Sequence, residues 1–152
     1  MALVQRDYIL RMIERIAAAI ARVMKRKSDG DLVGARQELQ QATMELLGPA
    51  SAMALMVDSR TAANLVGDAK RIQLWCRLLA EDREVLQSMG REAEARNADR
   101  RIVELLLEAW KREKEWDDET RAVFAAARAR GGDAAIDPGF RAALEAWEGE
   151  QR

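Results

Sequence analysis

Apolar residues near the start of this 152-residue chain recur every three or four positions. Successive steps of four, three, four and three residues join Ile9, Ile13, Ile16, Ile20 and Val23. One face of an α-helix repeats every 3.6 residues, so this spacing predicts an amphipathic helix over about residues 3–27. The alanines at positions 17–19 and 21 keep its middle slim, which allows another helix to approach closely.

The same periodicity, interrupted by capping residues and glycines, predicts helices along the rest of the chain. Ser28 or Asp31 is expected to cap the second helix, which Gly48-Pro49 ends. Apolar positions cover a wide arc of the helix expected at residues 68–89, so this helix is predicted to be central. The expected ranges are 31–47, 51–57, 61–66, 68–89, 91–112, 120–130 and a short last helix after Asp137-Pro138, with a turn at 58–60 and a loop at 131–133.

The segment from Lys111 to Glu119 is charged at every position except Trp116. Such a run fits either the exposed middle of a continuous helix or a break capped by Asp117 or Asp118. We favour the break.

The composition favours helices throughout. Ala, Leu, Arg and Glu supply 79 of the 152 residues, whereas Val, Ile and Thr supply only 18. We therefore predict one all-α domain over residues 1–152, made of about six to seven helices in antiparallel hairpins, without strands. Residues 115–152 are predicted to be a C-terminal extension that packs on this core or on a neighbouring subunit.

Two segments share the spacing G-x4-A at the start of a helix, Gly30 to Ala35 and Gly90 to Ala95. The first continues as Ala35-x3-Leu39-x2-Ala42, which resembles the second half of a tetratricopeptide unit. The W-x2-L-G-x2-Y first half is absent, and the two glycines are 60 residues apart, so a regular 34-residue repeat does not tile the chain. The expected architecture is tetratricopeptide-like hairpins.

The opening run D-Y-I-L-R-M-I-E, from Asp7 to Glu14, is more distinctive. Together with the following amphipathic helix, G-D turn and A-x3-L-x2-A helix, it resembles a family of uncharacterised bacterial helical proteins over residues 5–110. The resemblance implies an all-helical, tetratricopeptide-like fold. It brings no catalytic residue to this chain, and residues beyond 115 lie outside it.

The candidate chemistry is sparse. The chain has no histidine, which removes the commonest general base and metal ligand. Cys76, the only cysteine, lies on the most apolar helix and is predicted to be a buried small side chain. Glu113/Asp117 and Glu115/Glu119 have the i,i+4 spacing of one helix face, but alternating Lys and Arg point to a solvated charged surface. Phosphate-binding glycine motifs are absent, so we predict no catalytic, cofactor or metal site.

The sequence also bears on where the protein works. One cysteine permits no intrachain disulfide, the first residues lack the order of a signal peptide, and no run approaches the ~18 apolar residues of a membrane span. We therefore expect a cytoplasmic protein.

The net charge of −1 conceals an asymmetry. Residues 1–27 carry seven basic and two acidic side chains, a net of +5, and the remainder carries a net of −6. The basic first helix is expected to face acidic helices of its own chain or a protein partner. Alternatively, it binds anionic lipid or nucleic acid.

The tryptophans are the remaining clue. Trp75 is predicted to lie in the core, whereas Trp110, Trp116 and Trp147 lie at less apolar positions. Either the C-terminal helices fold back and bury them, or they form a partner surface, because exposed large aromatics mark interfaces. Tyr8 and Arg11 complete the candidate interaction surface, Tyr8 because its polar tip seeks a partner.

These observations together predict a non-enzymatic protein–protein interaction or scaffold module that self-associates. The alternative is a binder of nucleic acid or anionic lipid through the first helix. An enzyme that relies on carboxylates, arginines or Tyr8 would need a buried cluster of such residues in a polar pocket.

Overall fold

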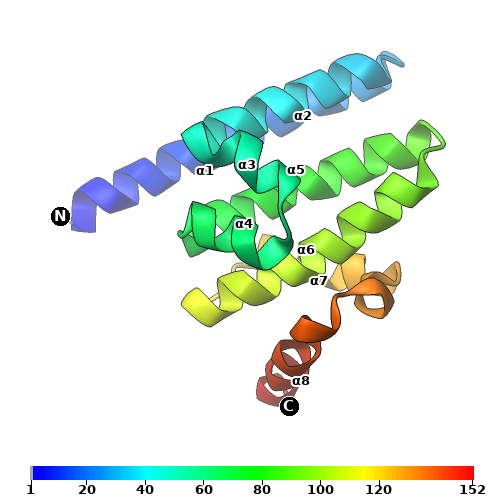
Figure 1. The fold of residues 1–152 in the computed structure, drawn as a ribbon. Helices are drawn as coiled ribbons and strands as arrows, with labels where there is room; N and C mark the ends of the chain where they lie inside the picture. The colour runs from blue at the N-terminus through cyan, green and yellow to red at the C-terminus, as the bar shows by residue number, and fades with distance from the viewer. Residues whose placement is uncertain (1) are drawn as a thin grey trace.

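The structure is a computed structural model that describes residues 2–152, with side chains from Val4 onward (Figure 1). Over these residues every regular element is a helix, which confirms the predicted all-α class without strands. The tetratricopeptide-like packing stays a prediction. In chain order the elements are α1 (Ala2–Ser28), α2 (Leu32–Leu47), η1 (Gly48–Ala50), α3 (Ser51–Met56), α4 (Ser59–Val66), α5 (Ala69–Ser88), α6 (Glu92–Arg112), α7 (Asp118–Ala129), η2 (Gly132–Ala135), η3 (Pro138–Phe140) and α8 (Arg141–Glu150), where η denotes a 3-10 helix.

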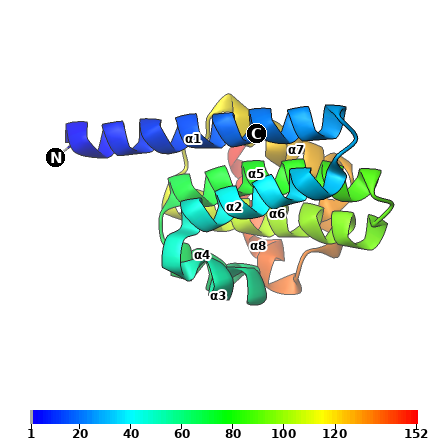
Figure 2. The same ribbon diagram turned by 90° about the horizontal axis from the view of Figure 1, so that it is seen from above.

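The hairpin of α5 and α6 lies at the centre of the molecule (Figure 1). The hairpin of α1 and α2 packs against α5, while α7, η2 and α8 pack against α6. Helices α3 and α4 turn the corner between the two hairpins. The first turns of α1 project well past the other helices (Figure 2).

Capping residues set the start of two helices, one where the sequence predicts it and one earlier. Asp31, rather than Ser28, caps α2, because its carboxylate accepts a 2.8 Å hydrogen bond from the backbone N–H of Gly34. The expected turn at 58–60 is wrong. Asp58 is the N-cap and Ser59 already begins α4, so the helix is two residues longer than predicted.

The break between α6 and α7 is confirmed. Helix α6 ends at Arg112, Glu113 is extended, and Asp117 caps α7 by accepting from the N–H of Thr120 at 2.7 Å. The helical spacing that would place Glu113 with Asp117 on one face therefore does not apply. Instead Glu113 pairs with Lys70 at 3.7 Å, while Glu119 of α7 pairs with Arg77 at 2.9 Å.

Residues 131–133 were predicted to form a loop, but the last two of them begin a 3-10 helix. Gly131 has φ +90°, a conformation that suits glycine, and Gly132 begins η2 against α6. Asp137 then caps η3, where its carboxylate accepts from the N–H of Gly139 at 2.9 Å.

The core reaches from α1 to α8. Trp75 and Cys76 of α5 are fully buried, and every residue of α6 from Ile102 to Trp110 is buried, including two glutamates. The sequence predicts one apolar face for α6, but this stretch is covered all round because α5 lies on one side and the C-terminal elements on the other. Among residues 2–152, no helix combines the length and apolar character needed to cross a bilayer.

Candidate functional site

Three of the predicted surface residues, Trp110, Trp116 and Trp147, come together at the C-terminal end of the fold. Trp116 lies in the break after α6, and Trp147 lies on α8. Their rings stack with centroids 5.9 Å apart. Phe124 of α7 meets both rings edge-on, at 5.0 Å from Trp116 and 4.7 Å from Trp147. Aromatic pairs of this geometry add stability beyond their buried area, so the cluster ties α8 to the body.

The chain's own helices cover most of this aromatic surface. Trp110 and Trp116 are each only 6 % exposed, and Trp147 is half-buried. What remains open is a cavity of about 260 Å³ that all three tryptophans and Phe124 line.

The charged residues that line this cavity are all basic. Lys114, Arg121 and Arg128 line it, and its lining contains no acidic side chain among the described residues. The Lys114 ammonium lies 4.6 Å from the centroid of the Trp110 ring, and the Arg128 guanidinium lies 5.3 Å from that of Trp147. Both distances suit cation–π attraction. We call this site the tryptophan pocket.

Tyr8 and Arg11, the other two predicted surface residues, lie on α1 and do not line the tryptophan pocket. Tyr8 is 46 % exposed, and its hydroxyl accepts a hydrogen bond from the guanidinium of Arg71 on α5. That guanidinium also lies 5.5 Å from the centroid of the Tyr8 ring. Arg11 is exposed to solvent. The candidate surface is thus divided between two separate places.

Two basic residues in the second half of α1 contact acidic groups of the same chain. Arg22 pairs with Glu38 of α2 at 3.0 Å, and Arg26 pairs with both Asp31 and Glu38. Part of the +5 charge of the first helix is therefore neutralised within the chain, by acidic residues at the start of α2 and along it.

The side of α1 that faces away from α2 leaves apolar residues open. Leu10 is 49 % and Met24 is 54 % exposed, and Ala17 is exposed between them. Ile13 and Ile20 are partly buried beside this strip. We call the strip formed by Leu10, Ala17, Ala21 and Met24 the outer flank of α1.

A second apolar surface lies between α2 and α5. A groove of about 330 Å³ has Leu39, Trp75 and Leu78 in its lining, with Met44 and Leu55 more than half exposed at its edge. This groove was not predicted from the sequence. The sequence feature that indicates it is the set of methionines at positions 44, 53 and 56, since exposed methionines are frequent at adaptable binding surfaces.

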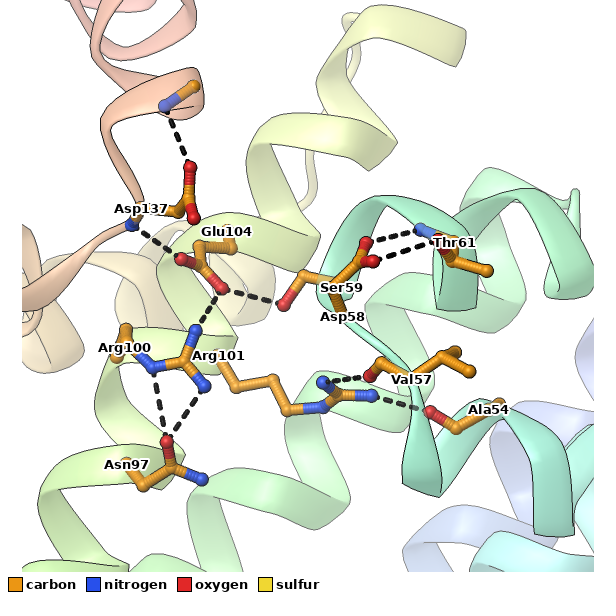
Figure 3. Close-up of polar contacts among 11 residues, drawn as sticks. Ala54, Val57, Asp58, Ser59, Thr61, Asn97, Arg100, Arg101, Glu104 and Asp137 are labelled. Carbon is orange, nitrogen blue, oxygen red and sulfur yellow. Dashed lines mark hydrogen bonds and ion pairs between the residues drawn. The ribbon is translucent and has the colours of Figure 1, made fainter.

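A buried polar junction joins α4, α6 and the C-terminal segment (Figure 3). The carboxylate of Glu104, 1 % exposed, accepts hydrogen bonds from the Ser59 hydroxyl at 2.7 Å, from Arg100 at 2.5 Å and from the N–H of Asp137 at 2.8 Å. Next to it, Arg101 donates to the carbonyls of Val57 and Ala54. Burial lowers the pKa of Arg101, with the neighbouring Arg100 charge acting in the same direction.

This junction is the polar cluster that an enzyme using carboxylates and arginines would need, and it borders an open cleft of about 410 Å³. However, Ser59 and Glu104 are each only 1 % exposed. Glu104 binds three donors of its own chain, as buried carboxylates require. The arrangement therefore suits a structural joint better than a reacting centre.

Comparisons with known proteins add no relative. Neither a scan against protein-family models nor searches of curated proteins and solved structures found a significant match.

Proposed function

We propose that this protein is a non-enzymatic protein–protein interaction module that self-associates, with a second copy docking on the outer flank of α1. The observation that carries this proposal is the exposure of Leu10 and Met24, at 49 % and 54 %, on the side of α1 that faces away from α2. Contiguous exposed apolar residues mark interaction surfaces. The single, buried Cys76 supports a reducing compartment, and we propose the cytoplasm.

The outer flank has the spacing of a helix–helix seam. Leu10, Ala17 and Met24 are seven residues apart, and Ile13 and Ile20 lie at the intervening positions. Apolar residues in such a heptad pattern let two helices pack side by side. Ala17 and Ala21 are small, so a second helix can come close.

Charge favours an antiparallel arrangement. With a two-fold axis at Ala17, Leu10 of one copy lies opposite Met24 of the other, and Asp7 lies opposite Lys25 or Lys27. Such an interface is self-complementary, as a two-fold dimer requires. The repulsion between two basic helices is reduced because Arg22 and Arg26 already pair with Glu38 on the α2 side.

The projecting end of α1 supports the same partner. Its Val4 is 70 % exposed, and no other helix lies beside these first turns (Figure 2). In the antiparallel dimer this end lies along the polar turn between α1 and α2 of the second copy, so the exposed Val4 is covered there.

The test is sedimentation velocity over a dilution series of the full chain. We expect a monomer–dimer equilibrium for the natural protein, and a shift to monomer for Leu10→Glu and Met24→Glu. Ala18→Glu is the matched control, because Ala18 is exposed on the same helix but lies off the outer flank. A natural protein that stays monomeric at every concentration overturns the proposal, and so do flank variants that dimerise like the control.

Exposed Arg11 and Arg15 favour one alternative, binding of nucleic acid or anionic lipid by the first half of α1. Such binding falls steeply with added salt. Titration with duplex DNA, RNA and anionic vesicles at two salt concentrations tests it. Salt-sensitive binding that is lost in the Arg11→Glu/Arg15→Glu variant would establish this alternative.

A further inference from the structure

We infer that the tryptophan pocket is a binding site for a small planar aromatic anion. This inference goes beyond self-association and does not depend on it, because the pocket and the outer flank of α1 share no residue. Two properties of the pocket support it: its aromatic walls and the sign of the charge that lines it.

The walls suit a flat ring. Trp116 and Trp147 present indole rings that already stack on one another, and Trp110 and Phe124 line the same cavity. Aromatic rings bind other aromatic rings by offset stacking or edge-to-face contact. The cavity of about 260 Å³ lies below the roughly 300–1,000 Å³ of sites for drug-sized ligands, so it fits a ligand of one or two rings.

The charge around the pocket selects an anion. Lys114, Arg121 and Arg128 are the charged groups in the lining. Lys114 and Arg128 have close acidic partners, Glu150 and Asp133, each at 2.7 Å, and Glu148 lies 3.7 Å from Arg128.

Arg121 is the most available of the three. Its contact with Asp118 is 3.6 Å long, and Asp118 is fully exposed, so solvent screens the pair. A carboxylate or sulfonate at the pocket can therefore attract the Arg121 guanidinium with little competition.

The experiment uses the full-length protein and three matched probes. Naphthalene-2-carboxylate carries both the ring system and the charge, 2-naphthalenemethanol carries the ring system alone, and cyclohexanecarboxylate carries the charge alone. Binding is followed by two-dimensional NMR of the four tryptophan indole N–H signals. Trp75 lies in the core on α5 and serves as the internal reference.

We expect naphthalene-2-carboxylate to shift the signals of Trp110, Trp116 and Trp147 in a saturable way and to leave Trp75 in place. We expect the two partial probes to bind at least tenfold more weakly. Arg121→Gln should weaken binding of the aromatic carboxylate by about three- to tenfold, as loss of a charge-assisted contact does. Arg141→Gln changes an exposed arginine of α8 outside the pocket lining and should have no effect.

Several results would overturn the inference. One is the absence of saturable shifts at the three pocket tryptophans, and another is equal binding of the neutral and anionic naphthalene probes. Unchanged affinity in Arg121→Gln also contradicts it. Because these signals are read in the Leu10→Glu variant as well as in the natural chain, failure of this inference and failure of self-association are separate results.

Discussion

The hydroxyl of Ser59 donates a 2.7 Å hydrogen bond to the carboxylate of Glu104, 45 positions further along the chain. Both side chains are 1 % exposed, and the same carboxylate binds the backbone N–H of Asp137. One glutamate therefore fixes the first turn of α4 and the entry to the C-terminal helices against α6. Removing it should loosen two distant segments at once.

We predict that Glu104→Ala lowers the free energy of unfolding by about 3 kcal/mol, because it leaves Arg100 and two other donors without their acceptor. Urea unfolding followed by circular dichroism measures the change. Glu94→Ala is the control, since Glu94 is exposed on the same helix, and its unfolding midpoint should scarcely move. Equal midpoints for the two variants would contradict a structural role for Glu104.

We predict that Gly132→Ala destabilises the protein. A Cβ at this position would lie 2.8 Å from the carbonyl oxygen of Ala127 and 2.9 Å from that of Asp99, and these are backbone atoms of α7 and α6. Because Gly132 lies in η2, this element must move away from both helices, so we expect a loss of about 1–3 kcal/mol in thermal or urea unfolding, as for overpacked cores.

Gly149→Ala is the matched control for this prediction. A Cβ there meets nothing within 4 Å, and the position lies in α8. Alanine should be neutral or stabilise the helix by up to about 1 kcal/mol. If Gly132→Ala were as stable as Gly149→Ala, the close approach of η2 to α6 and α7 at this point would be wrong.

The sequence predicts well those features that depend on neighbouring residues. Periodicity located α1, and the cap Asp117 followed by Thr120 fitted a break before α7. Such signals are local because a helix bonds to itself and its cap lies within one turn. The error at Ser59 has the same origin, since D-S-R has the composition of a turn as well as of a helix start.

Features that depend on distant contacts were not predictable in the same way. The burial of Glu104 was not predicted, because a glutamate is usually exposed and its partners come from α4 and from the C-terminal segment. The tryptophans were a sufficient signal to select Trp116 and Trp147 as candidates. Their stacking, and the basic residues around them, depend on how α8 returns to the body.

We predict that the thiol of Cys76 is inert in the folded protein. The side chain is fully buried, and burial raises its pKa, which suppresses the reactive thiolate. A chromogenic disulfide reagent at about pH 8 should react only as fast as the protein opens, and immediately in urea. Rapid reaction of the native protein in stoichiometric amount would contradict the packing of α5.

The last prediction concerns Asp58, the N-cap of α4. Its carboxylate accepts hydrogen bonds from the N–H of Thr61 at 2.8 Å and from the Thr61 hydroxyl at 3.0 Å. The backbone hydrogen bond, and then the hydroxyl, lower the pKa of Asp58 below its ordinary value. The unfolded chain therefore binds a proton at a higher pH than the folded one, and acidification favours unfolding at this site.

It follows that the contribution of the charged cap is fully present above the unfolded pKa of about 3.9 and is lost as the pH falls through the lower folded value. We expect the stability difference between the natural protein and Asp58→Ala to be constant above about pH 5 and to shrink below that. Asp58→Asn is the matched control, because asparagine also caps helices but does not titrate. In urea unfolding, the stability difference between Asp58→Asn and Asp58→Ala should be independent of pH. The prediction would be contradicted if the stability difference between the natural protein and Asp58→Ala grew on acidification.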